Sequence, residues 1–303
     1  MNIINKVLIA GAKGNIGSFL FEKLNKEYMI TRLDYDQESF EENSISLDLT
    51  DKEEVKKIAK TIPKGITLIF LVGLAHKKGK GQELDEFRRI NKQTLVNLLF
   101  ALEHNNNLPS KIIFASTISV YGEKINQNIY HEDSIKESFS PYAVTKLEAE
   151  DYLLENYSSI TWILRFAPVY APGFHLNIDR RTKVAGTYYK VGNGEKKLSL
   201  CNLENIGATV KSILENKVPA DVYNISDKES YTYNHLLKYV NAKSTLNIPA
   251  FLVKGVFYLG VIMNNIFLKE NCVKLITDNT FPSDKISMFI KLPSTMNEVI
   301  KND

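Results

Sequence analysis

The stretch GAKGNIG at residues 11–17 constrains the fold of this chain more than any other part of the sequence. It follows a strand-like apolar run at residues 7–10 and leads into an amphipathic helical pattern at residues 16–24. Strand, glycine-rich turn and helix in this order are the parts of a dinucleotide-binding site. The first glycines allow the backbone to approach a pyrophosphate, the last allows the helix to pack on the strand, and the free N–H groups of the helix start bind phosphate. The candidate cofactor-binding residues here are Gly11, Gly14, Asn15, Ile16 and Gly17.

A second strand-like run at residues 28–33 ends at Asp34. An acidic residue about 20 positions beyond the first glycine can bind both hydroxyls of the adenosine ribose. The same carboxylate would repel a 2′-phosphate, so the sequence predicts NAD as the cofactor. Arg32 leaves NADP open as the alternative.

Further along the chain, short β-rich runs alternate with helical patterns. The expected strands are residues 44–47, 68–72, 111–115, 161–166 and 222–225, and the expected helices are residues 52–61, 83–106 and 142–157. This alternation predicts an α/β fold with a Rossmann-type, doubly wound parallel sheet. Because such sheets bind ligands at the carboxyl ends of their strands, one cofactor groove is expected there. The residues at those ends are Asp34, Asp48, residues 71–75, Ser116 and Thr117.

Residues 141–150, PYAVTKLEAE, set Tyr142 and Lys146 four positions apart on an expected helix. This spacing places both side chains on one face, a turn apart. A free phenol has a pKa of about 10, but a fixed ammonium beside it favours the phenolate and lowers that pKa. A base poised near neutral pH can transfer a proton. The spacing also occurs by chance on surface helices, so its meaning depends on the other motifs.

The composition argues against several other classes of protein. A net charge of +3 over 303 residues is too small for a nucleic-acid partner, and the basic run at residues 76–80 is expected to be a solvated loop. Cys201 and Cys272 lie far apart without clustered histidines, so neither a metal site nor a disulfide framework is expected. The N-terminal residues lack the pattern of a secretory signal, which favours a cytoplasmic protein.

Together, these motifs resemble the extended short-chain dehydrogenase/reductase family, in its branch of nucleotide-sugar epimerases and dehydratases of the UDP-glucose 4-epimerase type. The matching stretches are GAKGNIG, Asp34, DLTD at 48–51, LVGLAH at 71–76, RRIN ending at Asn91, FASTISVYG at 114–122, SPYAVTK ending at Lys146, and LRFAPVYAPG at 164–173. The resemblance implies that Thr117 is the hydroxyl partner of Tyr142 and that Lys146 also holds the nicotinamide ribose. It implies further cofactor contacts at Asp48 and Leu49, which border the adenine, and at Leu71, Val72, Gly73, Asn91 and Ser116.

Two departures from the family pattern narrow the expected reaction. Family dehydratases carry an Asp-Glu pair just after the position of Thr117, and decarboxylases carry a Glu, whereas this chain has Ile118 and Ser119. The resemblance therefore implies a UDP-sugar 4-epimerase that works through a transient 4-keto sugar and enzyme-bound NADH. The alternatives are a 4-keto-sugar nucleotide reductase and a non-catalytic dinucleotide-binding sensor or scaffold. Pro168 and Ala171 replace the usual Asn and Gly, which leaves the exact sugar open.

The sequence predicts an NAD-binding domain of residues 1–170 plus 203–230 and a smaller α+β substrate-binding domain of residues 171–202 plus 231–303. In the segment 192–207, Lys197 stands where the family usually has an Arg on the diphosphate, and Cys201 stands where a His is common. Asn177 is a second diphosphate candidate, with loop capping as its alternative role. The substrate-binding candidates are Thr117, Asn177 and Lys197.

Residues 248–263 form the most apolar stretch of the chain. A spanning helix needs about 20 apolar residues, so we expect a packed helix of the substrate domain instead. Peripheral membrane contact, useful in the synthesis of cell-surface polysaccharide, is the alternative.

Family relatives dock the helices expected at 83–106 and 142–157 into a four-helix interface, which predicts a homodimer. Its candidate contacts are Leu95, Leu99 and Leu102, with contact to the sheet as the alternative for the same three residues.

Overall fold

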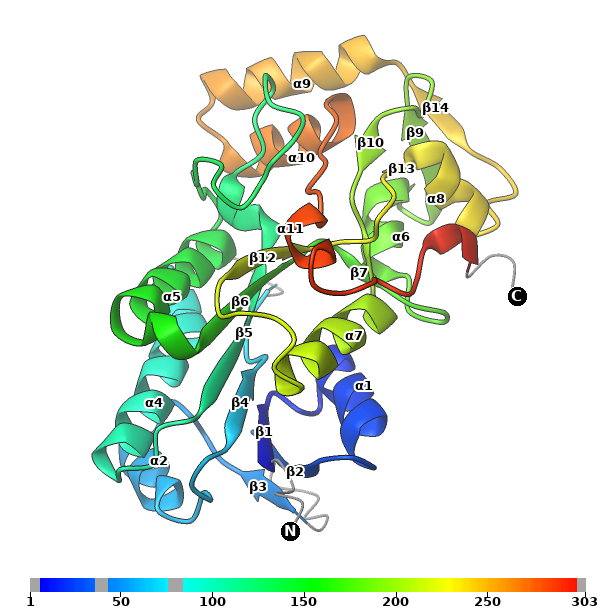
Figure 1. Ribbon diagram of the computed structural model, residues 1–303. Coiled ribbons are helices and arrows are strands. Elements are labelled where there is room, and N and C mark those ends of the chain that lie inside the picture. Colours follow the sequence, from blue (N-terminus) through cyan, green and yellow to red (C-terminus); the bar gives the residue numbers. More distant parts are fainter. Residues whose placement is uncertain (1–5, 36–42, 76–83, 299–303) are drawn as a thin grey trace. The chain divides into compact units, whose positions relative to one another are not determined.

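The computed structural model describes residues 6–35, 43–75 and 84–298 (Figure 1). The basic run predicted to be a loop at residues 76–80 lies outside the described residues. The chain divides into two compact units. The first comprises Met1–Thr117, Pro141–Leu164 and Val210–Val222, and the second comprises Ile118–Ser140, Arg165–Thr209 and Tyr223–Asp303.

Seven strands form one sheet in the order β12-β6-β5-β4-β1-β2-β3. The strands are β1 Lys6–Ala10, β2 Met29–Asp34, β3 Ser44–Ser46, β4 Thr67–Phe70, β5 Lys111–Thr117, β6 Thr161–Phe166 and β12 Val222–Ile225. β1 pairs in parallel with both β2 and β4, β2 with β3, and β4 with β5. A chain that starts at the centre and winds outward in both directions is the doubly wound arrangement of Rossmann folds. The predicted α/β class is therefore confirmed.

Helices pack on both faces of this sheet in the first unit. They are α1 Asn15–Leu24, α2 Lys52–Ala59, α3 Leu84–Arg88, α4 Thr94–His104 and α5 Pro141–Tyr157. Figure 1 shows α2, α4 and α5 on one side of the strands and α1 on the other. Under α2, α4 and α5 lies a core to which Val55, Leu98 and Leu153 contribute from the helices and Leu68 and Ile112 from the strands.

The helix predicted at residues 83–106 is not continuous. A π-helix at Arg89–Gln93 separates α3 from α4. Such wide turns reorient side chains within a helix and are frequent at functional sites. Here the π-helix contains the buried Asn91, whose side-chain oxygen accepts a hydrogen bond from the Leu74 N–H at 2.6 Å.

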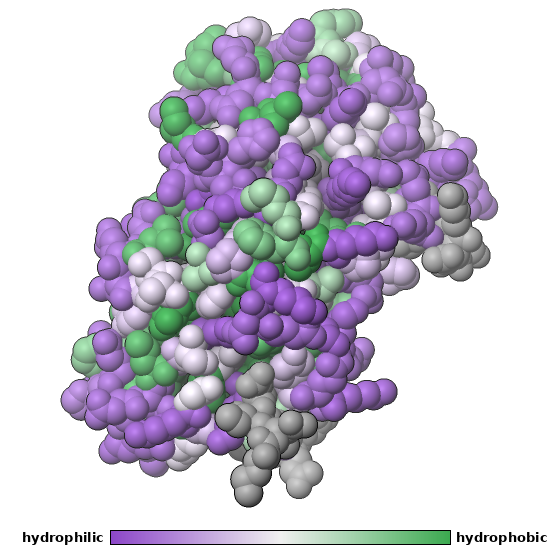
Figure 2. Space-filling view, in the orientation of Figure 1, coloured by the Kyte–Doolittle hydropathy of each residue, from purple (hydrophilic) through white to green (hydrophobic). Residues whose placement is uncertain are grey.

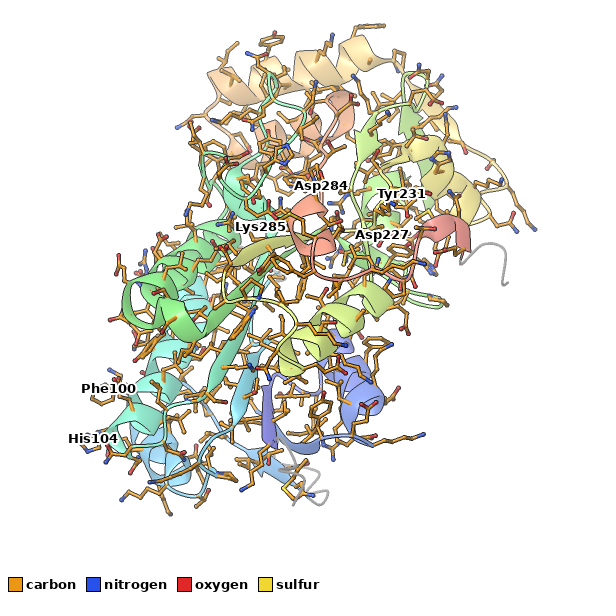
Figure 3. The ribbon with its side chains drawn as sticks, in the orientation of Figure 1. Phe100, His104, Asp227, Tyr231, Asp284 and Lys285 are labelled. Carbon is orange, nitrogen blue, oxygen red and sulfur yellow. The ribbon has the colours of Figure 1, made fainter. Side chains whose placement is uncertain are left out.

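The leucines predicted to form a dimer interface lie inside the protein. Leu95, Leu99 and Leu102 are fully buried in the core between α4 and the sheet. Their assignment as interface contacts is therefore wrong, because the sheet already covers that face of α4. The exposed aromatic residue of α4 is Phe100, which stacks on His104 with ring centroids 6.2 Å apart (Figure 3).

The second unit is built from short strands and helices. Its strands are β7 Val169–Tyr170, β8 Lys183–Val184, β9 Thr187–Val191, β10 Lys197–Leu198, β11 Cys201–Asn202, β13 Tyr231–Thr232 and β14 Leu246–Ile248. Its helices are α6 Leu176–Thr182, α8 Tyr233–Tyr239, α9 Ala250–Ile262, α10 Ile266–Ile276 and α11 Asp284–Ser287, and α7 Leu203–Leu214 runs from this unit into the first.

A buried carboxylate, Asp227, joins several of these elements. It accepts a hydrogen bond from the hydroxyl of Tyr231 at 2.9 Å (Figure 3). It accepts another from the hydroxyl of Tyr170 at 2.6 Å. It also accepts bonds from the Asn202 N–H and from the side-chain amide of Asn205, both at 2.7 Å. Burial raises the pKa of Asp227 to about 6, and the hydrogen bonds oppose that rise. These bonds connect β7, β11, α7 and β13.

The apolar stretch at residues 248–263 contains α9, which packs on α10. Only Val253 and Gly260 of this helix are buried. The predicted helix is present, but it is packed along one narrow face and most of its apolar side chains are exposed. Among the described residues, no helix has both the length and the apolar character needed to cross a membrane.

Candidate active site

The glycine-rich loop joins β1 to α1 in a conformation that excludes side chains at Gly11 and Gly17. Gly11 has a φ of +84°, and a Cβ atom at Gly17 would lie 2.4 Å from the Gly11 oxygen and 2.7 Å from the Ala12 Cα. A side chain at position 17 would therefore displace the loop. Gly14 precedes α1 and has no side chain to cap it, so the N–H groups of Asn15 and Ile16 lie at a helix start that favours an anion.

Asp34 lies at the end of β2 and lines a cavity of about 430 Å³ next to this loop. Its carboxylate accepts hydrogen bonds from the backbone N–H groups of Lys13 at 2.7 Å and Tyr35 at 2.8 Å. Because a carboxylate has about four acceptor positions, it can still accept bonds from ribose hydroxyls. Arg32 lines the same cavity, with its guanidinium 4.3 Å from the centroid of the Phe21 ring.

Asp48 and Leu49 follow β3. The Asp48 carboxylate accepts a hydrogen bond from the Thr50 N–H at 2.8 Å, so it shapes the turn that begins there. Leu49 is buried, and its carbonyl accepts a bond from the side chain of Asn97 at 2.9 Å. The two residues are thus held at the predicted strand end.

The loop after β4 contains Leu71, Val72 and Gly73. Leu71, the first residue of this loop, is still hydrogen-bonded to β1, since its N–H donates to the Ala10 carbonyl at 2.8 Å. The side chain of Asn91 is hydrogen-bonded to the backbone N–H and carbonyl of Leu74, at the end of this loop. It also donates to the Thr145 hydroxyl on α5 at 2.9 Å. In this structure, therefore, Asn91 makes its bonds within the protein and positions the loop.

Tyr142 lies in the first turn of α5, half-buried, and Thr117 is the last residue of β5. Their side chains are hydrogen-bonded, and this bond favours the ionised phenol. Burial has the larger effect and raises the pKa of Tyr142 to about 12. The end of β5 and the start of α5 thus bring the hydroxyls of Thr117 and Tyr142 together, although 24 residues lie between them in the sequence. The resemblance implied this pairing.

Lys146 lies one turn further along α5 and is only 2% exposed. Its ammonium donates to the carbonyl oxygens of Ala115 at 2.9 Å and Val72 at 3.1 Å. It also lies 4.7 Å from the centroid of the Phe114 ring. A Cβ atom at Gly73 would be 3.1 Å from Nζ, so this loop position leaves room for the amine.

Burial lowers the pKa of Lys146 to about 7, and Glu150 opposes this shift. The sequence predicted that Lys146 would lower the pKa of Tyr142, but within this chain the phenol pKa is raised. The reason is that burial penalises the ionised forms of both groups, and an amine with a pKa near 7 carries only part of a charge at neutral pH.

Sequence reasoning did not identify Glu150 as part of this site. Its side chain is fully buried and accepts a hydrogen bond from the Ser116 hydroxyl. Ser116, expected to contact the cofactor, therefore anchors this carboxylate. The signal was present in the sequence, because Tyr142, Lys146 and Glu150 repeat at intervals of four and so share one face of the helix.

The two substrate-binding candidates outside the sheet lie in the second unit. Asn177, in the first turn of α6, donates to the Val169 carbonyl at 2.9 Å. Lys197 begins β10 with its side chain exposed, and its N–H donates to Asp278 at 2.9 Å. Cys201 is buried, and burial together with Asp227 raises the pKa of its thiol well above its usual value.

Residues 7–247 match the NAD dependent epimerase/dehydratase family. An N-acetyl-alpha-D-glucosaminyl-diphospho-ditrans,octacis-undecaprenol 4-epimerase from Escherichia coli O157:H7 is 27% identical over an aligned length of 256 residues, and the match covers 81% of this chain and 74% of that protein.

Two solved structures show the same fold. A UDP-glucuronic acid 4-epimerase from Bacillus cereus in complex with NAD has a TM-score of 0.69 at 20% identity, over 98% of this chain and 94% of that chain. A UDP-glucose 4-epimerase from Thermus thermophilus, also in complex with NAD, has a TM-score of 0.70 at 18% identity, over 97% of this chain and 96% of that chain.

NAD fits the residues described above. The N-cap residue of α1 is Gly14, which has no side chain, and Asp34 offers acceptors to a ribose but would repel a 2′-phosphate. The family match covers most of the chain and names the same cofactor. The protein therefore belongs to the NAD dependent epimerase/dehydratase family, as an enzyme of the extended short-chain dehydrogenase/reductase type that uses NAD.

Proposed function

We propose that the protein is a 4-epimerase of a nucleotide sugar, with UDP as the nucleotide and Tyr142 as the acid and base. The observation that carries this proposal is the hydrogen bond between Thr117, at the end of β5, and Tyr142, which shares a face of α5 with the buried Lys146. A phenol that exchanges a proton with a sugar hydroxyl needs a hydroxyl partner and a nearby cation, and these residues supply both.

In the proposed reaction, the Tyr142 oxygen takes the proton of the sugar 4-hydroxyl while carbon 4 gives up its hydrogen with the bonding electrons and becomes a ketone. NAD, when bound, supplies the acceptor for that hydrogen and a positive charge near the phenol. Tyr142 then returns its proton to the sugar oxygen after the opposite face of carbon 4 has been reduced. Because Tyr142 starts and ends the cycle as the phenolate, the cycle consumes no net acid, base or reductant.

The other residues keep Tyr142 competent for this exchange. Thr117 donates to the phenol oxygen and thereby offsets part of the pKa increase that burial causes. Lys146 places its amine on the same face of α5, held by the carbonyls of Val72 and Ala115. We also propose the predicted division of labour, in which residues 1–170 plus 203–230 hold NAD and residues 171–202 plus 231–303, with Asn177 and Lys197, hold the sugar diphosphate.

Elimination of water from the sugar is a less suitable reaction for this site. It requires a further acid, which family dehydratases carry just after the position of Thr117. Here Ile118 occupies that position, and it is apolar and buried. This favours epimerisation, and we assign the reaction to the cytoplasm and to the synthesis of cell-surface polysaccharide.

A sugar carried on a polyprenyl diphosphate is a second candidate substrate. The observation that favours it is the relative from Escherichia coli, whose name gives an undecaprenol-linked sugar and whose similarity extends over 81% of this chain. The chemistry at carbon 4 would be the same, since both carriers end in a diphosphate on the sugar.

The experiment is to incubate the purified protein with UDP-glucose, UDP-N-acetylglucosamine, UDP-glucuronic acid or an N-acetylglucosaminyl diphospho-polyprenol, and to analyse the sugar by NMR. We expect one of these to reach an equilibrium of the two C4 epimers without consumption of NADH. Tyr142→Phe is the control for catalysis. If a 4-keto sugar is instead reduced with one NADH consumed per product, the enzyme is a reductase; if NAD binds but no sugar is converted, it is not an epimerase of these substrates.

A further inference from the structure

The α9–α10 hairpin has an apolar surface that its own fold does not use. We define this hairpin face as the exposed apolar side chains of α9 and the start of α10, chiefly Phe251, Tyr258, Leu259, Ile262, Met263 and Phe267. Their exposed fractions lie between 55% and 81%. Figure 2 shows green, hydrophobic side chains among purple ones over α9. Soluble proteins rarely leave large apolar side chains clustered in this way without a partner.

The helix pair is held together by its other face. Val253 and Phe257 of α9 pack near Cys272 and Ile276 of α10. The connection between the helices is tight, because Asn265 caps α10 by accepting from the Leu268 N–H at 3.1 Å, and its own N–H donates to the Gly260 carbonyl at 2.8 Å. The exposed apolar residues therefore do not result from a loosely packed helix.

The charges around the hairpin indicate what covers it. Between Glu229 and Glu270 the sequence contains no Asp or Glu but has four lysines, at positions 238, 243, 254 and 269. Lys243 and Lys254 are exposed. An apolar face bordered by lysines matches a membrane whose lipid headgroups are anionic, because the long lysine side chains can reach the headgroups while apolar side chains enter the acyl region.

The length of α9 indicates whether it would span such a membrane or lie at its surface. Its 13 residues extend about 20 Å, less than the hydrocarbon thickness of about 30 Å. A short helix that is apolar on most sides and flanked by lysines is suited to lying within the membrane interface.

A small, mostly apolar cavity adjoins the hairpin. It has a volume of about 230 Å³ and is lined by Phe257 and Ile266 of the hairpin and by Ile125 and Phe139. Four charged residues also line it, namely Glu123, Lys124, Lys269 and Glu270. Ile125 and Phe139 are themselves exposed. The apolar surface therefore continues from the hairpin to the segment Ile118–Ser140 of the same unit.

We propose that the hairpin face is a membrane-docking surface that holds the enzyme on an anionic lipid bilayer without crossing it. The proposal does not depend on the reaction at Tyr142, since it concerns a different surface and can be tested without substrate. It would, however, place an enzyme of this kind next to lipid-linked sugars.

The test is flotation of the full chain with vesicles of phosphatidylglycerol and phosphatidylcholine. We expect binding that weakens with added salt and with a decreasing fraction of phosphatidylglycerol. The double variant Phe251→Asp, Ile262→Asp should bind at least about tenfold more weakly, because two large apolar side chains no longer enter the lipid. Lys243→Glu with Lys254→Glu should weaken binding several-fold at low salt, since each lysine contributes at the anionic surface.

A matched control is Tyr35→Asp with Met288→Asp. These residues are 70% and 72% exposed, comparable to Phe251 at 71% and Ile262 at 81%, but lie outside both the hairpin and the segment Ile118–Ser140. The control should bind vesicles like the parent, and the circular dichroism of all variants should match the parent. Failure of the parent to bind anionic vesicles, or equal loss in the control, would overturn the proposal. So would self-association of the parent that Phe251→Asp, Ile262→Asp abolishes in the absence of vesicle binding, because the face would then contact a second copy.

Discussion

Lys146 and Glu150 lie one turn apart on α5, both buried, and the negative charge of Glu150 opposes the decrease in pKa that burial imposes on the Lys146 amine. The carboxylate is in turn bonded by the Ser116 hydroxyl at the end of β5. The helix face thus carries three ionisable side chains in succession, Tyr142, Lys146 and Glu150. Of these groups, Glu150 favours the charged form of the Lys146 amine.

We expect Glu150→Gln to lower the pKa of Lys146 further below its value of about 7. Removing a negative charge destabilises the ammonium, so the amine should lose its proton at a lower pH. NMR titration of protein with 13C-labelled lysine would measure this shift. The pH profile of turnover should move in the same direction on its alkaline side.

Glu148→Gln is the control for that variant. Glu148 is on the same helix but is partly exposed and bonded to Arg88 at 2.8 Å. Its substitution should leave the Lys146 titration unchanged. Equal shifts in both variants would mean that Lys146 responds to net charge on α5 rather than to Glu150.

The lowered pKa of Lys146 also predicts how stability varies with pH. An unfolded lysine has a pKa of 10.5, whereas the folded value is about 7, so between these values the unfolded state binds more protons. The free energy of unfolding should therefore rise with pH across this interval, at up to about 1.4 kcal/mol per pH unit from this group. Lys146→Met should remove the rise.

Urea unfolding of the NAD-free protein at several pH values between 7 and 10 would measure this difference. Lys56→Met, which removes an exposed lysine of α2, should leave the slope intact. Parallel curves for the parent and Lys146→Met would show that the buried amine does not change protonation on unfolding.

We expect Asp34→Asn to weaken NAD binding by ~1–3 kcal/mol, the usual cost of losing hydrogen bonds to a charged group. Isothermal titration would measure it. Glu22→Gln is a matched control, because Glu22 is a second carboxylate in the wall of the same cavity. Its NAD affinity should equal that of the parent. Equal or tighter binding of NADP by the parent would contradict the assigned role of Asp34 and favour Arg32.

The parts of the site that the sequence predicted are those encoded locally. Gly17 and Asp34 belong to short strand–turn–helix patterns whose geometry follows from a few residues. The structure has Gly17 in the first turn of α1 and Asp34 at the end of β2, as expected. Tyr142 and Lys146 share a helix face for the same reason. The pairing of Thr117 with Tyr142 came from the family resemblance, because spacing alone carries no information on contacts between distant segments.

The parts that the sequence did not predict depend on tertiary packing. In α4, apolar residues occur on more than one face, so periodicity could not show that Leu95 and Leu99 meet the sheet while Phe100 does not. The π-helix contains Asn91, which is bonded to Leu74 and Thr145, and sequence spacing does not reveal either of these distant contacts. The pKa values of Tyr142 and Lys146 depend on burial, which reversed the expected direction for the phenol.

The predicted homodimer now has a different candidate contact. Since the leucines of α4 are buried, Phe100, which is 56% exposed and stacked on His104, is the aromatic group that α4 can present to a second copy. We expect sedimentation to give a dimer for the parent and a monomer of 34.4 kDa for Phe100→Asp. Ile135→Asp, an equivalent change at another exposed site, should remain dimeric. A monomeric parent would refute the homodimer, and a dimeric Phe100→Asp would exclude this contact.

The proposed function depends most on Tyr142. Tyr142→Phe keeps the aromatic ring and its packing, so the fold and NAD binding should persist while turnover falls by the ~10²–10⁴-fold typical of a lost general acid and base. Thr117→Ala should cost less, because it removes one hydrogen bond to the phenol oxygen, and Thr117→Ser, which restores a hydroxyl, should recover most of that loss. Turnover of the most suitable sugar substrate, followed by NMR at carbon 4, measures all three variants. Near-parental turnover in Tyr142→Phe would reject the mechanism, and equal turnover in Thr117→Ala and Thr117→Ser would show that the hydroxyl at position 117 does not act through the phenol.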